Sequence, residues 1–92
     1  MFDAVATDSP NTGITMYGAQ WCGDCRRSKR FLDANRIAFT YIDSELDPAA
    51  AKKIVDISGT QSIPVIVFPD GSFMSEPSDQ DLKAKLETLA IL

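Results

Sequence analysis

Short apolar runs alternate with segments whose apolar residues repeat at helical spacing. The short runs are rich in β-branched and aromatic residues, which is typical of strands. They cover residues 14–19, 37–43, 63–68 and 72–75. The segments with helical spacing lie at 23–36, 48–58 and 79–89. The predicted order is therefore strand, helix, strand, helix, strand, strand, helix.

Capping residues mark the ends of the second and third expected helices. Asp47 can cap the second helix, Pro48 suits its first position, and Gly59 stands where it should end. Ser78 can cap the third helix, with Asp81 three residues on as a weak capping box. We expect these inward-facing residues: Ala50, Ala51, Ile54, Val55 and Ser58 in the second helix, and Leu82, Leu86 and Leu89 in the third, with Lys83 and Lys85 outside.

The chain has room for one folded domain. At 92 residues it can bury one modest core, and a second domain would not fit. Residues 1–12 are polar and end in a turn cluster, so we expect a flexible lead-in followed by a domain over 13–92. No apolar run approaches the roughly 20 residues of a membrane span. The first residues lack the features of a secretory signal, so we expect a cytoplasmic protein.

Charge and residue usage exclude several kinds of site. Nine Lys and Arg against thirteen Asp and Glu give a net charge of −4, which argues against a nucleic-acid binder. The sequence contains no histidine and two cysteines, so a histidine base and a complete zinc site are both excluded. We therefore expect no metal site.

The two cysteines, Cys22 and Cys25, stand where an expected strand meets an expected helix. A disulfide between them would close too short a loop to stabilise the fold, so the pair indicates chemistry. Cys22 at the helix N-terminus would have a lowered thiol pKa, and Cys25 would lie one turn on, within disulfide reach. Asp24 would raise the thiol pKa. The nearby cations would lower it, and which effect is larger stays open: Arg26, Arg27, Lys29 and Arg30.

Four sequence features resemble the glutaredoxins of the thioredoxin superfamily. They are Met16-Tyr17, Trp21-Cys22-x-x-Cys25, Ser62-Ile63-Pro64 and Asp70-Gly71-Ser72. The resemblance implies a thioredoxin-like α/β fold with a four-stranded mixed sheet flanked by three helices. Its first two strands would be parallel and its last two antiparallel. It also implies a cis Pro64 facing the active cysteine, with the backbone of Ile63 offered to the substrate.

Within that family the chain is most similar to the actinobacterial mycoredoxins. The similarity runs through Trp21–Gly23, Ala34–Ala38, Ala49–Ala51, Asp70–Ser72, Pro77-Ser78 and Lys83–Leu86. Glutathione-dependent members usually have a Gly-Gly-Asp turn where this chain has Glu76–Asp79, and often a lysine before the cysteine motif, where residues 17–21 contain no cation. Mycothiol lacks the carboxylates of glutathione, which is consistent with both departures. Asp24 departs further, because the family commonly has tyrosine there.

The resemblance implies thiol–disulfide exchange on mycothiol mixed disulfides, with Cys22 as nucleophile and Cys25 as resolving thiol. Mycothiol would be a co-substrate, with no bound cofactor, and NADPH would act through a separate mycothiol disulfide reductase. The expected substrate-binding residues are Trp21, Gly23, Asp24, Ile63, Pro64, Glu76, Ser78 and Asp79. Trp21 would either recognise partners or cover the thiol. The expected partners are mycothiol and mycothiolated proteins, with no nucleic acid and no membrane, and we expect a monomer.

Two other functions stay open at this point. One is a dithiol redoxin reduced by thioredoxin reductase, of the type that donates electrons to ribonucleotide reductase. The other is a carrier of a [2Fe–2S] cluster, held by a dimer with one cysteine per chain and two small thiols. Two cysteines and the missing Gly-Gly turn make the cluster carrier the weaker alternative.

Overall fold

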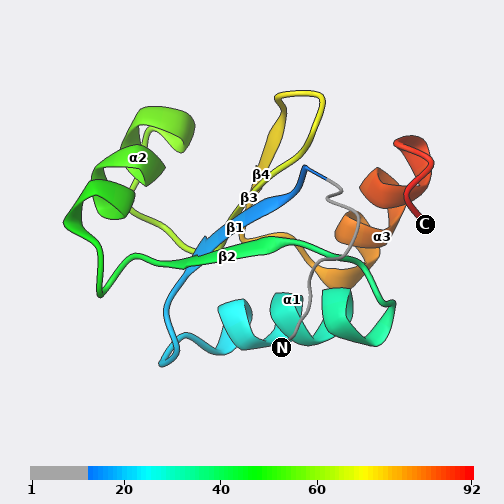
Figure 1. Cartoon of the computed structure of the whole chain (residues 1–92), viewed down its shortest axis with the longest axis horizontal. Helices are drawn as coiled ribbons and strands as arrows, with labels where there is room; N and C mark the ends of the chain where they lie inside the picture. Colours follow the sequence, from blue (N-terminus) through cyan, green and yellow to red (C-terminus); the bar gives the residue numbers. More distant parts are fainter. Residues whose placement is uncertain (1–12) are drawn as a thin grey trace, which may run out of the picture.

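The computed structural model describes residues 13–92 (Figure 1). Its elements follow in the predicted order. They are β1 (Thr15–Gly18), α1 (Gly23–Ala34), β2 (Thr40–Asp43), α2 (Pro48–Ser58), β3 (Val65–Val67), β4 (Phe73–Ser75) and α3 (Asp79–Thr88). The lead-in expected over residues 1–12 lies outside the described residues. No helix in the described range is long and apolar enough to cross a membrane.

The strands form one four-stranded mixed sheet in the order β2-β1-β3-β4. β1 pairs with β2 in parallel, with Thr15 opposite Thr40, and with β3 antiparallel, with Met16 opposite Ile66. β3 and β4 are antiparallel, with Ile66 opposite Met74. The expected strand directions are therefore confirmed. Because β1 and β2 are parallel, the segments that follow them meet at one edge of the sheet, and this edge carries both cysteines.

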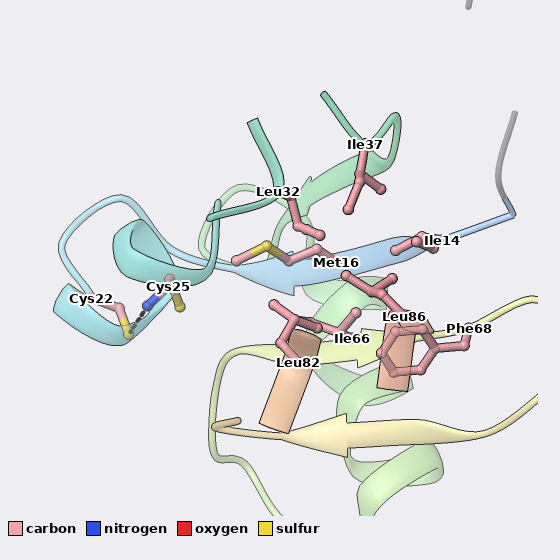
Figure 2. Packing of buried hydrophobic residues seen from close by; sticks show 10 residues of the cluster. All are labelled: Ile14, Met16, Cys22, Cys25, Leu32, Ile37, Ile66, Phe68, Leu82 and Leu86. Carbon is pink, nitrogen blue, oxygen red and sulfur yellow. Dashed lines mark hydrogen bonds between the residues drawn. The ribbon is translucent and has the colours of Figure 1, made fainter. Parts of the chain in front are cut away.

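Helices cover both faces of the sheet (Figure 1). α1 and α3 lie together on one face, and α2 lies on the other. The larger core fills the α1–α3 side, and Figure 2 shows its buried residues, which are Ile14, Met16, Cys22, Cys25, Leu32, Ile37, Ile66, Phe68, Leu82 and Leu86. The smaller core under α2 consists of Tyr17, Ala50, Ile54 and Val65. Neighbouring residues of one strand thus belong to different cores, as pleated strands require.

The predicted caps are present. The Asp47 carboxylate accepts a hydrogen bond from the backbone N–H of Ala49, and Gly59 ends α2 in the left-handed conformation at φ 80°. The Ser78 hydroxyl oxygen accepts from the N–H of Asp81 at 3.0 Å.

Several elements are shorter than predicted. α1 ends at Ala34, because Asn35 caps it and Arg36 adopts a positive φ of 58°, which a helix excludes. β3 is limited to Val65–Val67, because Pro64 has no N–H to pair and the N–H of Phe68 already turns back to the carbonyl of Ser72.

Three expected side-chain positions were wrong. Ala51 and Val55 of α2 are exposed, since the short helix buries a narrower stripe centred on Ala50 and Ile54. Lys85 of α3 is not outside. Its ammonium lies 5.5 Å from the centre of the Phe68 ring and pairs with Asp70 at 3.3 Å.

Candidate active site

Cys22 caps the N-terminus of α1. A tight turn, closed by a hydrogen bond from the N–H of Cys22 to the carbonyl of Ala19 at 3.2 Å, leads from β1 into the helix. The Cys22 sulfur accepts a hydrogen bond from the backbone N–H of Cys25 at 3.3 Å (Figure 2). An N–H aimed at a sulfur stabilises its thiolate form. The fold therefore places this thiol where backbone groups favour negative charge.

Cys25 lies one turn into α1 and is more deeply buried than Cys22, at 1% exposed against 8%. Both thiols are free. Burial, first, and the hydrogen bond with Cys22, second, raise the pKa of the Cys25 thiol to about 12. The two cysteines, three residues apart, thus differ in their surroundings. The Cys22 sulfur accepts a backbone hydrogen bond, whereas burial raises the pKa of the Cys25 thiol.

Gly18, the last residue of β1, leaves the space that Cys25 occupies. A Cβ at this position would stand 2.9 Å from the Cys25 sulfur and 3.4 Å from the Tyr41 hydroxyl. Only glycine lets the backbone of β1 approach the thiol this closely. From the sequence, Gly18 was expected only as one residue of the strand over 14–19.

The segment before β3 faces the Cys22 sulfur. The Ile63–Pro64 peptide bond is cis, as the resemblance implied. The Cys22 thiol points at the carbonyl oxygen of Ile63 at 3.9 Å. The N–H of Glu76 donates to the carbonyl of Pro64 at 2.8 Å, which holds the loop after β4 beside this segment. Ile63, Pro64 and Glu76 therefore lie together near Cys22.

Arg27 connects the start of α1 to the start of α3. Its guanidinium lies 2.8 Å from a carboxylate oxygen of Asp24 and 3.7 Å from one of Asp79, and it donates to the carbonyl of Pro77 at 3.3 Å. Two residues predicted to bind substrate, Asp24 and Asp79, thus already have a cationic partner. The hydroxyl of a third, Ser78, is engaged in the cap of α3.

A groove of about 300 Å³ lies beside the cysteine motif, and we call it the Trp21 groove. It is lined by Trp21, Ser44, Glu45, Ala51, Ile54, Gln61 and Ile63. Trp21 is 67% exposed. Two hydrogen bonds from Ser44 to the carbonyl of Gly18, at 2.9 Å from its N–H and 3.2 Å from its hydroxyl, hold the loop after β2 against the end of β1.

A second cavity lies on the other side of the motif, between α1 and β2. This α1–β2 cavity has a volume of about 490 Å³ and is lined by Ala19, Gln20, Cys25, Arg26, Lys29 and Tyr41. The cations predicted to act on the thiols have partners here. Arg26 donates to the carbonyl of Gln20 at 2.8 Å, and Lys29 pairs with Asp33 at 3.3 Å.

Sequence reasoning missed the α2 side of the site. Ser44, Glu45 and Gln61 line the Trp21 groove, yet no motif marks them. One signal was available, because residues that follow two parallel strands meet at the same edge of a sheet. Ser44 and Glu45 directly follow β2, as the turn to Cys22 follows β1.

The described residues offer few groups for a metal. Over residues 13–92, no three His, Cys, Asp or Glu side chains gather closely enough to hold an ion. The site there is a cysteine pair between a neutral-to-acidic groove and a cavity with two cations.

A dithiol at the start of a helix, opposite a cis-proline segment in a β-α-β-α-β-β-α domain, defines a thioredoxin-like thiol–disulfide oxidoreductase. The glutaredoxin family model matches residues 14–74, and the chain belongs to this family.

Known relatives support this assignment. A Mycobacterium tuberculosis protein provisionally named a glutaredoxin is 41% identical over 78 residues, which cover 84% of this chain and 93% of that protein. Mycoredoxin 1 of Corynebacterium glutamicum is 28% identical over 80 residues, covering 86% and 99%. Among solved structures, the glutaredoxin of Archaeoglobus fulgidus superimposes with a TM-score of 0.69 at 29% identity, covering 77% of this chain and 82% of that one.

Proposed function

We propose that this glutaredoxin reduces mixed disulfides between mycothiol and protein thiols, with Cys22 as the nucleophile. The Cys22 thiolate attacks the mycothiol sulfur. A Cys22–mycothiol disulfide forms, the original disulfide breaks, and the protein leaves as a thiolate that takes up a proton. The stabilised Cys22 sulfur at the start of α1 supports this assignment.

Two routes regenerate Cys22. A second mycothiol thiolate can attack the bound mycothiol sulfur, which forms mycothiol disulfide and releases Cys22. Alternatively, Cys25 attacks the Cys22 sulfur, which expels mycothiol and forms the Cys22–Cys25 disulfide. The N–H of Cys25 already contacts the Cys22 sulfur, which supports an attack by Cys25 on Cys22. Disulfides between two protein cysteines need this second route, and there the protein thiolate is the group that leaves. A separate mycothiol disulfide reductase with NADPH would return the mycothiol pool to its reduced state.

The residues that line the Trp21 groove are the reason for proposing mycothiol, and not glutathione, as the small thiol. Glutathione has two carboxylates, whereas mycothiol is a hydroxyl-rich sugar thiol with none. Among the described residues that line the groove none is cationic, and Glu45 is acidic. Ser44 and Gln61 offer neutral hydrogen-bonding groups, and the exposed Trp21 ring offers a flat surface for a sugar. Glu45 would repel a carboxylate, so the groove suits the uncharged thiol.

The relative named Mycoredoxin 1 supports the same choice. A cysteine pair that acts as a reductant suits a reducing compartment, which supports a cytoplasmic location. Gly23, Asp24, Glu76, Ser78 and Asp79 stay predicted ligand residues.

The test is NADPH-dependent turnover of a small mixed disulfide with three recycling systems. These are mycothiol with its disulfide reductase, glutathione with glutathione reductase, and thioredoxin reductase alone. We expect turnover with mycothiol. Turnover only with thioredoxin reductase would overturn the mycothiol proposal, and would assign the protein as a dithiol redoxin that depends on Cys25.

A charge reversal at Glu45 tests whether the acidic lining of the groove selects against glutathione. We expect Glu45→Lys to raise the ratio of glutathione to mycothiol turnover about fivefold, because a cation near the surface attracts a carboxylate by about 1 kcal/mol. Asp56→Lys is the matched control, since it makes the same change of charge on an exposed α2 residue that does not line the groove. Equal ratios in the two variants would show that the groove does not select the thiol.

A further inference from the structure

The buried position of Cys25 raises a chemical problem for its role as resolving thiol. To attack Cys22 it must become a thiolate, yet it is 1% exposed, and burial is the largest of the causes that raise its pKa. Cys22 cannot accept the proton, because its sulfur is occupied in the mixed disulfide. Asp24 is exposed and already paired with Arg27. Neither residue can therefore take the proton, and another group near Cys25 is needed to stabilise its thiolate.

The α1–β2 cavity brings one hydroxyl to this thiol. Cys25 and Tyr41 both line the cavity, and their sulfur and oxygen atoms lie 2.9 and 3.4 Å from a single point beside Gly18. Tyr41 packs against the same core as α1, whereas Tyr17 on the neighbouring strand belongs to the core under α2. In the described part of the chain, the Tyr41 hydroxyl has no hydrogen-bond partner. Its O–H is thus free to turn toward the sulfur.

The charges around this pair favour a neutral phenol and a stabilised thiolate. Burial, first, and then the charges of Asp43 and of the two thiols raise the pKa of Tyr41, so the hydroxyl keeps its proton and remains a donor. From α1, Asp24 opposes a negative Cys25, and a backbone hydrogen bond with Ala19 favours it. Arg26 and Lys29 line the same cavity. The cavity is large enough for several waters.

We propose that Tyr41 is the positioning residue of the resolving thiol, and that its hydroxyl donates a hydrogen bond, directly or through one water in the α1–β2 cavity, to the Cys25 sulfur as this sulfur reacts. The Cys25 proton passes to water in the cavity. The thiolate attacks the Cys22 sulfur, the bond from Cys22 to the substrate sulfur breaks, and the departing thiolate takes a proton from solvent. The disulfide is exchanged within the reactants, so no further oxidant or reductant is needed. This inference rests on the resolving role of Cys25 in the proposed function, and not on mycothiol.

The test uses the reduced protein and 5,5′-dithiobis(2-nitrobenzoate). Attack by Cys22 releases a first equivalent of coloured thiolate, and attack by Cys25 on the mixed disulfide releases a second. In Tyr41→Phe we expect the first phase to keep its rate. The second phase should slow about tenfold at neutral pH, because a hydrogen bond to a charged sulfur is lost. The pH profile of the second phase should move up by about one unit.

Two further measurements separate positioning from packing. Tyr17→Phe removes the hydroxyl of a buried tyrosine that belongs to the core on the opposite face of the sheet, and it should leave both phases unchanged. In the Cys22→Ser background, adding Tyr41→Phe should raise the midpoint of the Cys25 thiolate absorbance titration.

The outcomes are distinct. An unchanged second phase in Tyr41→Phe, or equal slowing of both phases with a matching loss of stability, would overturn the proposal. Release of a single equivalent by the wild-type protein would also overturn it, because there would be no resolving step. Failure of the mycothiol assay alone would leave these results standing, since mycothiol takes no part in them.

Discussion

The two cysteines show how position alone gives one residue type two different roles. Cys22 lies before the first turn of α1, where a backbone N–H points at its sulfur and the Ile63 carbonyl faces it. Cys25 lies inside the helix, against Gly18 and the cavity that contains Tyr41. One side of the pair adjoins the Trp21 groove, whose described lining residues include no cation, and the other adjoins Arg26 and Lys29. Three residues of separation are enough for one sulfur to accept a backbone hydrogen bond at the helix start while burial raises the pKa of the other.

The largest expected difference between the two positions is in activity. Cys22→Ser should abolish turnover of a mixed disulfide, because no other thiol is placed to attack it. Cys25→Ser should keep most of this turnover when a small thiol is in excess, and lose activity on disulfides between two protein cysteines. Steady-state assays on both substrate types measure this. Residual mixed-disulfide turnover in Cys22→Ser would reverse the assignment of roles.

Filling the space beside Cys25 should have the next largest effect. The added methyl group of Gly18→Ala would meet the sulfur at 2.9 Å. We expect a loss of about 1–3 kcal/mol in the free energy of unfolding, which is the usual cost of overpacking. Gly23→Ala is the control, since nothing lies within 4 Å of its added Cβ, and a helical alanine should cost nothing. Urea unfolding of both variants measures the effect, and equal stabilities would show that β1 moves freely away from Cys25.

The raised pKa of Cys25 predicts a loss of stability at alkaline pH. This thiol ionises at about 9.0 ordinarily and at about 12 in the folded protein. Unfolding therefore releases a proton between these values, and the free energy of unfolding falls as pH rises through that window. Below pH 9 the group contributes no pH dependence. Urea unfolding from pH 8 to 11 should show a steeper decline for the wild type than for Cys25→Ala, and parallel curves would contradict the burial of this thiol as the cause.

Replacing Arg27 should have the smallest effect on stability and on the reaction of Cys25. Its pairs with Asp24 and Asp79 are about half exposed, so Arg27→Gln should cost less than about 1 kcal/mol of stability. The variant frees the Asp24 charge, which opposes a negative Cys25, so the second phase of the dithiobis-nitrobenzoate reaction should slow modestly at low salt. Lys29→Gln removes a cation that pairs with Asp33, and it serves as the control for stability. A faster second phase in Arg27→Gln would show that Asp24 does not act on Cys25.

Local signals account for what the sequence predicted well. The caps at Asp47, Gly59 and Ser78 depend on residues within one turn, and the cysteine motif is contiguous, so both are visible in the chain. The Trp21 groove joins residues from Trp21 to Ile63, and the α1–β2 cavity joins Gln20 to Tyr41. The shapes of this groove and this cavity depend on how closely helices and strands distant in the sequence approach one another in the fold. Lys85 was misplaced for the same reason, because the Phe68 ring that it covers lies just after β3, far from Lys85 in the sequence.

The arrangement of the larger core has a consequence for biosynthesis. The core that contains Cys25 is formed by α1 and β1 from early in the chain and by Leu82 and Leu86 of α3 from near its end. During translation both thiols therefore emerge long before the helix that completes their protection, and β1 waits for β3, some fifty residues later, to pair on its second side. The thiols of a nascent chain are therefore open to oxidation for longer than they would be if α3 came early in the sequence.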